Sequence, residues 1–244
     1  MRMSRLSRVL LFASALVALC IFAPSCGSSS STAQYRVVQT IPDAPGNFDI
    51  SIDGKNVFTN VAFGSTEPIS GYNSVSAGSD PIEVFQIGIT TPVINSTSLN
   101  LIVGTQSTVL LTGLYVAPTA VAFRDDNTAP LSGQAELRMV DASPSAPASL
   151  DIYIVAPGID ITQREPTISP LQFAQQSAYQ DLTTESSGYA QTMVIVTKSG
   201  DTTKTQLVNQ IYTLSEGQII TLVLVDVPGG GALSFSPLEL NDLN

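Results

Sequence analysis

Most of the side chains in this sequence that could do chemistry are carboxylates. Seven aspartates lie near predicted loops or strand ends: Asp43, Asp49, Asp53, Asp125, Asp126, Asp141 and Asp151. Oxygen-rich loops are what Ca²⁺ requires, with roughly six to eight ligands. Asp49 and Asp53 stand four residues apart on a predicted strand, hence on one face, but the bidentate Glu that completes a calcium loop does not follow. We therefore expect solvated surface charge and no bound metal, with a calcium site as the alternative.

The residue inventory excludes most catalytic chemistry. The sequence contains no histidine, which removes a Ser-His-Asp triad, a Cys-His pair and a histidine-ligated zinc. Its two cysteines, Cys20 and Cys26, both lie in the N-terminal segment, so we expect no disulfide. Lys198-Ser199-Gly200 resembles one motif of the penicillin-recognising enzymes, but Ser-x-x-Lys is absent. Two carboxylates could still hydrolyse a glycoside, which is the remaining enzymatic alternative. We expect no enzyme and no cofactor.

The first residues have the pattern of an export signal. Arg2, Arg5 and Arg8 precede an apolar stretch, Val9–Phe22, that is too short to span a bilayer comfortably. Small residues, which are typical of a signal cleavage site, follow this stretch. Residues 1–25 are therefore predicted to be a signal peptide that is removed on export.

Cys26 follows this signal and precedes Gly27 and a run of serines. The arrangement resembles the lipobox of bacterial lipoproteins, which implies a diacylglycerol on the Cys26 thiol. A cysteine that carries several acyl chains is stably anchored without spanning the membrane, and residues 26–34 are the predicted Ser-rich tether. We expect a bacterial cell-envelope protein, with Gly27 favouring the outer membrane or cell surface. Ala23 replaces the usual Leu, so a secreted or periplasmic protein is the alternative.

The charge balance is sparse and acidic. The chain carries 10 Lys and Arg against 20 Asp and Glu, a net charge of −10. Three of the basic residues and none of the acidic ones lie in the predicted signal, so the mature chain carries about −13. Because Lys and Arg do not cluster, we expect no nucleic-acid partner. The expected partners are the membrane, through the lipid anchor, and an envelope polysaccharide or protein. A monomer is the default.

The sequence repeats itself. The segment from Arg36 to Pro45 returns from Arg138 to Pro147, 102 residues later and without a gap. A period of this length is one small domain rather than a solenoid unit. We therefore predict a first repeat over residues 35–127, a linker over 128–134 and a second repeat over 135–244.

Both repeats consist of short β-branched or aromatic runs between turn residues, and no long helical period occurs. The strands predicted in the first repeat are Tyr35–Ile41, Phe48–Asp53, Pro81–Ile89, Ser98–Val103, Thr108–Val116 and Thr119–Phe123. Those predicted in the second are Leu137–Ala142, Leu150–Val155, Tyr189–Lys198, Thr205–Leu214, Gln218–Asp226 and 232–235. The pattern predicts an all-β protein of two tandem immunoglobulin-like or transthyretin-like antiparallel β-sandwich domains.

The residues that recur most clearly are given structural roles. Paired prolines, Pro42 with Pro45 and Pro144 with Pro147, fix the backbone of an arch between the first two strands of each repeat. Asp49 and Asp151 are expected to accept hydrogen bonds from loop N–H groups. Arg36 and Arg138 could form structural ion pairs with these two aspartates.

Three further features bear on binding. The long connection Ala156–Pro170 in the second repeat is a candidate binding loop. Tyr72 and Tyr179 occupy comparable places and are expected to be half-buried rather than sugar platforms. Phe63 and Phe173 also correspond and are expected in the core.

The recurring pattern is similar to a known bacterial family. Its elements are Arg-x-Val-x-x-x-Pro-x-Ala-Pro, then apolar-Asp-Ile-x-Ile, Asp53-Gly54, Val61-Ala62-Phe63-Gly64 and Asp126-Asn127-Thr128-Ala129-Pro130. They resemble domain of unknown function 4397, from Tyr35 onward. The second copy lacks the Asp-Gly turn. The resemblance implies a secreted or surface-tethered β-sandwich, in tandem, without catalytic residues.

These observations predict a non-catalytic, lipid-anchored envelope protein that acts as a binding or structural β-sandwich module. The alternatives are a calcium- or carbohydrate-binding adhesin-like protein and, less favoured, a carboxylate-dependent glycoside-active enzyme.

Overall fold

The computed structural model describes residues 31–78, 80–231 and 233–242, which lie in one compact unit. The predicted signal peptide and Cys26 fall outside these residues. Every regular element described is a β-strand, so the predicted all-β class is confirmed. Among the described residues, the structure contains no helix with the length and hydropathy needed to cross a membrane.

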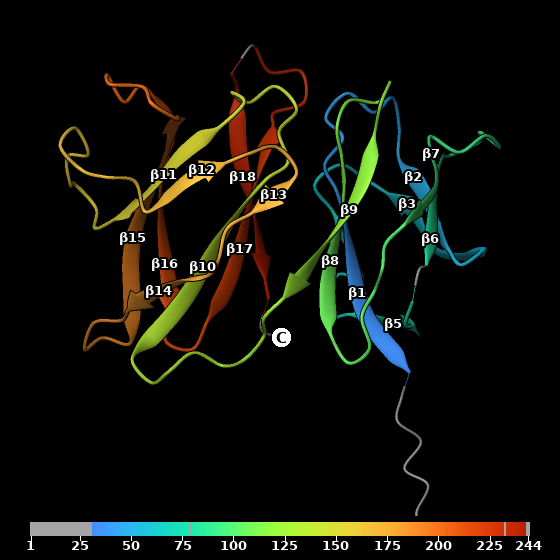
Figure 1. Ribbon diagram of the computed structural model, residues 1–244, viewed down its shortest axis with the longest axis horizontal. Coiled ribbons are helices and arrows are strands. Elements are labelled where there is room, and N and C mark those ends of the chain that lie inside the picture. Colours follow the sequence, from blue (N-terminus) through green and yellow to red (C-terminus); the bar gives the residue numbers. More distant parts are fainter. Residues whose placement is uncertain (1–30, 79, 232, 243–244) are drawn as a thin grey trace, which may run out of the picture. The chain divides into compact units, whose positions relative to one another are not determined.

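The first repeat is a sandwich of two sheets (Figure 1). Its strands are β1 (Thr32–Gln39), β2 (Phe48–Ile52), β3 (Lys55–Val61), β4 (Thr66–Glu67), β5 (Asn73–Ser76), β6 (Pro81–Gln86), β7 (Ile94–Ser98), β8 (Gln106–Thr112) and β9 (Thr119–Asp125). The inner sheet has the order β4–β1–β8–β9, with β5 also paired to β1, and the outer sheet has the order β3–β2–β6–β7.

The second repeat follows the same plan strand for strand. Its strands are β10 (Gln134–Asp141), β11 (Leu150–Val155), β12 (Ile168–Leu171), β13 (Gln175–Gln176), β14 (Gln180–Thr183), β15 (Tyr189–Lys198), β16 (Gln206–Ser215), β17 (Ile219–Asp226) and β18 (Phe235–Asn241). Its inner sheet is β13–β10–β17–β18, with β14 also on β10, and its outer sheet is β12–β11–β15–β16.

Each inner sheet contains one parallel pair in an otherwise antiparallel fold. β1 runs parallel to β8, with Val37 opposite Val109, and β10 runs parallel to β17. This pairing places β1 and β10 inside their sheets, where both strand faces are covered. The burial of these two strands is accordingly almost continuous rather than alternating.

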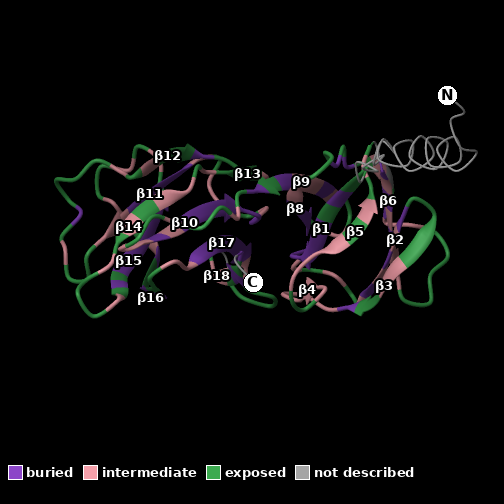
Figure 2. Ribbon diagram, turned by 90° about the horizontal axis from the view of Figure 1, so that it is seen from below, coloured by how far each residue is buried: buried purple, intermediate pink, exposed green. Residues whose placement is uncertain are grey.

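Three clusters of buried apolar side chains lie between sheets. Figure 2 shows the buried residues along the strands of both repeats. One cluster lies between the two sheets of the first repeat and one between the two sheets of the second. The third lies between the inner sheets, where Val38 and Leu110 of the first repeat join Val140 and Val223 of the second. The repeats therefore pack face to face through their inner sheets instead of being joined by the linker alone.

Two predicted boundaries shift. Residues 32–34 were expected in the tether but already belong to β1, because they pair with β5 and, at Gln34, with β8. The connection between the repeats spans residues 126–133 instead of 128–134, since β9 ends at Asp125 and β10 begins at Gln134.

Three predictions in loop-rich regions are wrong. The strand expected over 98–103 is β7, Ile94–Ser98, because Asn100 has a positive φ and ends the extended run. The last strand, expected over 232–235, is Phe235–Asn241, an edge strand that tolerates Pro237. Phe173, expected in the core, is 39% exposed on the turn before β13.

The Asp53-Gly54 turn joins β2 and β3, and both residues have positive φ angles of 52° and 70°. Such a two-residue hairpin loop needs both central residues in the left-handed region, which Asp and Gly allow.

The long connection of the second repeat covers the outer sheet. Residues 168–170 of the predicted loop belong to β12, which leaves 156–167 as loop. Ile161 from this loop is 3% exposed and packs with Tyr153 and Ile195. Lys204 Nζ lies 4.7 Å from the centre of the Tyr153 ring and donates to the carbonyl of Ile161 at 2.9 Å. The loop therefore protects apolar surface.

This packing predicts a stability loss for Ile161→Ala of about 2 kcal/mol or more, since the change removes buried methyl groups. Urea unfolding measures it. Ile211→Ala on β16 is the control, because Ile211 is 54% exposed and its truncation should change stability by less than about 0.5 kcal/mol. Equal effects of the two changes would contradict a covering role for the loop.

Candidate functional site

The main cluster of charged side chains lies between the two inner sheets. Arg36 on β1 and Arg138 on β10 are 2% and 1% exposed. Neighbouring residues on each strand point into the repeat's own core, so the arginines point toward the other repeat. A buried guanidinium needs a counter-ion and acceptors for its five N–H groups.

Each arginine obtains its closest carboxylate from the other repeat. Arg36 Nη2 donates to Asp242 Oδ1, and Arg138 Nη2 donates to Asp125 Oδ1. Asp125 ends β9 and Asp242 follows β18, so the two aspartates hold equivalent places in the two repeats. We refer to these four residues as the Arg–Asp exchange. It carries two positive and two negative charges and is neutral as a whole.

A threonine on the neighbouring parallel strand completes each half. Arg36 Nε donates to Thr108 Oγ1 at 2.9 Å, and this hydroxyl donates to Asp125 Oδ2 at 2.7 Å. In the second repeat, Arg138 Nε donates to Thr221 Oγ1 at 2.7 Å, which donates in turn to Asp242. Parallel pairing of the first and eighth strands of each repeat is what brings these side chains together.

A tyrosine covers each guanidinium. The centre of the Tyr72 ring lies 5.2 Å from Arg36 Cζ, and that of Tyr179 lies 4.7 Å from Arg138 Cζ. Each tyrosine hydroxyl donates a hydrogen bond to the aspartate of its own repeat: Tyr72 to Asp125 and Tyr179 to Asp242, both at 2.9 Å. Burial, the largest influence, raises the pKa of both phenols, so they remain protonated donors. Both tyrosines are half-buried, as the sequence indicated.

The carboxylates keep Arg36 charged. Burial lowers its pKa, but Asp242 and Asp125 outweigh burial and the net pKa is raised. Its Nη1 also donates to the carbonyl of Asn241 at 2.8 Å. The exchange and the groups around it therefore link the two repeats by hydrogen bonds and ion pairs.

The structure corrects the predicted partners of the arginines. Arg36 and Arg138 pair with Asp242 and Asp125, not with Asp49 and Asp151. Asp151 does accept a loop N–H group, from Gly200 at 3.2 Å, whereas Asp49 accepts the N–H of Asn60 on the neighbouring strand β3 at 3.0 Å.

The prolines lie where the sequence placed them, in the connections between β1 and β2 and between β10 and β11. Pro42 and Pro45 flank Ala44, and Pro144 and Pro147 flank an equivalent alanine. Each alanine packs against the core of its repeat, so each arch closes one end of a sandwich.

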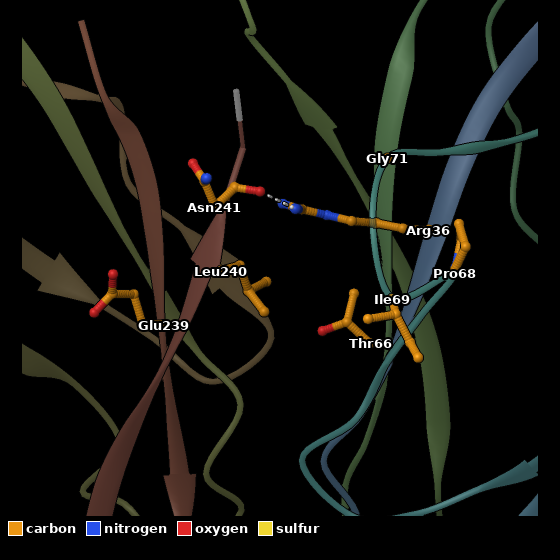
Figure 3. A pocket seen from close by; sticks show the side chains of 8 residues that line it. All are labelled: Arg36, Thr66, Pro68, Ile69, Gly71, Glu239, Leu240 and Asn241. Carbon is orange, nitrogen blue, oxygen red and sulfur yellow. Dashed lines mark hydrogen bonds between the residues drawn. The ribbon is translucent and has the colours of Figure 1, made fainter. Parts of the chain in front are cut away.

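A small pocket opens beside Arg36 at the junction of the repeats (Figure 3). It has a volume of about 130 Å³ and is lined, besides Arg36, by Thr66, Pro68, Ile69 and Gly71 of the first repeat and by Glu239, Leu240 and Asn241 of β18. Beside Arg138, the equivalent arginine of the second repeat, the side chain of Gln176 is present, and its Oε1 accepts a hydrogen bond from Arg138. The pocket is well below the roughly 300 Å³ of ordinary ligand sites, so it is not a strong candidate for substrate binding.

The outer sheet of the first repeat is a better candidate surface. Asp49 and Ser51 on β2 alternate with core residues, as do Glu83 and Phe85 on β6, and the four line an open hollow of about 280 Å³. Carboxylates and hydroxyls beside one half-buried aromatic ring are suited to hydrogen bonding and stacking with a polar ligand such as a sugar.

The same surface of the second repeat is different. Strand register makes Tyr153 equivalent to Ser51, and its neighbour Ile195 equivalent to Glu83. This apolar pair is covered by Ile161 of the long loop. One repeat therefore closes this face with its own chain, whereas the other presents polar side chains. We refer to the surface formed by Asp49, Ser51, Glu83 and Phe85 as the open face.

The fold and the exchange define a protein of two tandem β-sandwiches packed through their inner sheets. Residues 33–153 match the model of the family described as "Domain of unknown function (DUF4397)". The resemblance drawn from the motifs is thus confirmed over these residues. The match runs from β1 into β11 and includes both partners of the Asp125–Arg138 pair. Comparison with curated proteins gives no match.

Two solved structures are similar at low identity. One is the product complex of a multi-modular glycogen-degrading pneumococcal virulence factor, SpuA, with 10% identity, a TM-score of 0.24 and coverage of 78% of this chain. This chain spans about a fifth of that protein, 21%. The other concerns alpha-glucan recognition by family 41 carbohydrate-binding modules from streptococcal virulence factors, with 12% identity, a TM-score of 0.25 and coverage of 80% and 95% of the two chains.

Of the buried carboxyl groups outside the exchange in the described residues, Asp141 is the most deeply buried. Asp141, at the end of β10, is fully buried, and its Oδ1 accepts the N–H of Ser143 at 3.0 Å. Its Oδ2 has no hydrogen-bond partner in the described structure. Burial, with a smaller contribution from Asp226, raises the pKa of Asp141 to about 7. The equivalent residue of the first repeat is the neutral amide Gln39.

Asp242→Asn should destabilise the protein by roughly 3–5 kcal/mol, because it leaves the buried Arg36 without its nearest counter-charge. Urea unfolding at neutral pH measures the loss. Asp126→Asn is the matched control, since Asp126 is exposed and the change should alter stability by less than about 0.5 kcal/mol. Arg36→Met combined with Asp242→Leu should recover much of the loss, and a further loss would contradict the exchange.

The raised pKa of the buried Asp141 carboxyl group predicts that the stability of the protein depends on pH. The folded pKa of Asp141 lies above its unfolded value, so the native state binds more protons than the unfolded state between about pH 4 and 7. Its contribution to stability is therefore full at low pH and decreases as pH rises through this range. Asp141→Asn should stabilise the protein at pH 8 and make the change between pH 5 and 8 smaller, as measured by urea unfolding. A variant that follows the wild-type profile would contradict this assignment.

Proposed function

We propose that the protein is a non-catalytic, lipid-anchored module of the bacterial cell envelope that binds polysaccharide on the open face of its first repeat. The observation that carries this proposal is the contrast between the two outer sheets. Tyr153 and Ile195 are covered in the second repeat, whereas Ser51 and Glu83 at the same places stand open beside Phe85. Polar groups around an aromatic ring match the hydroxyl groups and apolar faces of a sugar.

The distribution of charged groups favours binding or a structural role over catalysis. The buried carboxylates Asp125 and Asp242 are each paired with an arginine. In the described part of the chain, no three acidic or cysteine side chains are placed to hold a metal ion together. A passive envelope scaffold is the alternative to binding, and glycoside hydrolysis by paired carboxylates is less favoured.

The anchor is proposed from the sequence. Cys26, after an apolar export signal and before a serine run, is the proposed site of lipid attachment, and β1 starts six residues later. The partner is then the membrane together with an envelope polysaccharide, and not nucleic acid, because the mature chain is acidic.

Thermal melts of the protein against a panel of envelope polysaccharides test the binding proposal. A polymer that binds only the folded state should raise the melting temperature by mass action, and Phe85→Ala should abolish the shift. Phe173→Ala is the control, since Phe173 is an exposed phenylalanine of the second repeat. If no polysaccharide raises the melting temperature, or if Phe85→Ala leaves the shift intact, binding at the open face is contradicted and the passive scaffold is favoured.

A further inference from the structure

Two apolar side chains are exposed together on the connection between β7 and β8. Ile102 and Val103 are each 55% exposed. They begin a tight turn in which the N–H of Thr105 donates to the carbonyl of Ile102 at 3.2 Å, and Gly104 supplies the positive φ of 70°. The turn is thus a fixed element that holds two hydrophobic side chains outward.

Hydrogen bonds tie this turn to the first residues of β1. The N–H of Gly104 donates to the carbonyl of Thr32 at 2.9 Å, and the N–H of Gln34 donates to the carbonyl of Thr105 at 2.9 Å. The exposed pair therefore lies at the end of the sandwich where β1 begins. In Figure 1 the start of β1 and the start of β8 lie at the same end of their sheet.

The distance to the proposed anchor is short. Six residue steps separate Cys26 from Thr32, which span at most about 21 Å even when fully extended. An acylated Cys26 at the bilayer surface keeps this end of the sandwich close to the membrane. No charged residue occurs between Glu83 and Arg124, so the segment that carries the turn brings no charge of its own to the lipid. Charged residues of neighbouring elements, Asp53 and Lys55 beside Thr32 and Arg124 opposite Ser107, lie at the same end and must stay in water or among the headgroups.

We infer that Ile102 and Val103 enter the membrane–water interface as a second contact beside the lipid anchor. This inference rests on the proposed acylation of Cys26. Two attachment points fix the orientation of the sandwich, whereas a tethered lipid alone leaves it free to rotate. The β8–β9 connection, at the far end of β8, then points away from the bilayer.

The chain contains no tryptophan, so a single introduced tryptophan reports its own surroundings. Val103→Trp probes the proposed contact. Val116→Trp is the matched control, because Val116 is 86% exposed on the β8–β9 connection. Both full-length proteins are isolated from bacterial membranes, the acyl groups on Cys26 are verified by mass, and the proteins are reconstituted into phosphatidylcholine vesicles with and without brominated lipid.

The expected result is a shift of Val103→Trp emission to shorter wavelength and its quenching by brominated lipid, with neither effect for Val116→Trp. Equal, weak quenching of both acylated variants would overturn the membrane contact and leave the anchor intact. A Cys26 without acyl groups, in a protein missing from the membrane fraction, would overturn the anchor and the inference with it. A concentration-dependent emission shift of Val103→Trp in detergent without vesicles would indicate that the turn contacts a second copy of the protein. That result would also overturn the inference.

Discussion

Each repeat of this protein buries an arginine whose nearest counter-charge comes from the other repeat. Removing a guanidinium from water is unfavourable by several kcal/mol unless charge and hydrogen bonds are returned to it. Asp242 and Asp125 return that charge across the junction. Neither inner sheet can therefore keep its buried face without its partner, and the two sandwiches form one unit. The apolar contacts of Val38 and Val140 around the charges exclude water and strengthen this dependence.

The exchange explains several features of the fold that look unrelated in the sequence. The parallel insertion of β1 beside β8 brings Arg36 next to Thr108, and Thr108 in turn orients Asp125. The same geometry in the second repeat uses β10 and β17. Because both halves are built alike, the junction has approximate two-fold symmetry within one chain. A duplicated domain that once paired with a copy of itself would produce this arrangement, since each copy carries both the arginine and the aspartate.

Local signals in the sequence predicted local structure well. The Asp53-Gly54 hairpin and the proline arches follow from adjacent residues, and the structure has both in the expected places. The 102-residue repeat follows from comparing two segments of the sequence directly. The exchange could not be derived in the same way, because Arg36 and Asp242 are 206 positions apart. A signal did exist: Asp125 and Asp242 each stand two residues after a large apolar residue and two residues before an asparagine. Nothing local distinguishes that aspartate from a solvated one.

The two faces of each sandwich are under different constraints, and this is where the repeats diverge. The inner faces must remain complementary, so arginine, threonine, tyrosine and aspartate recur in both copies. The junction lies between the inner sheets, so the outer faces are not held by this complementarity and are free to change. Ser51 and Tyr153 occupy the same place on β2 and β11, yet one lines an open hollow and the other anchors a covering loop. A ligand that required both outer faces would have kept them alike. Under the proposed binding role, the divergence leaves recognition to the first repeat, whose outer face is open.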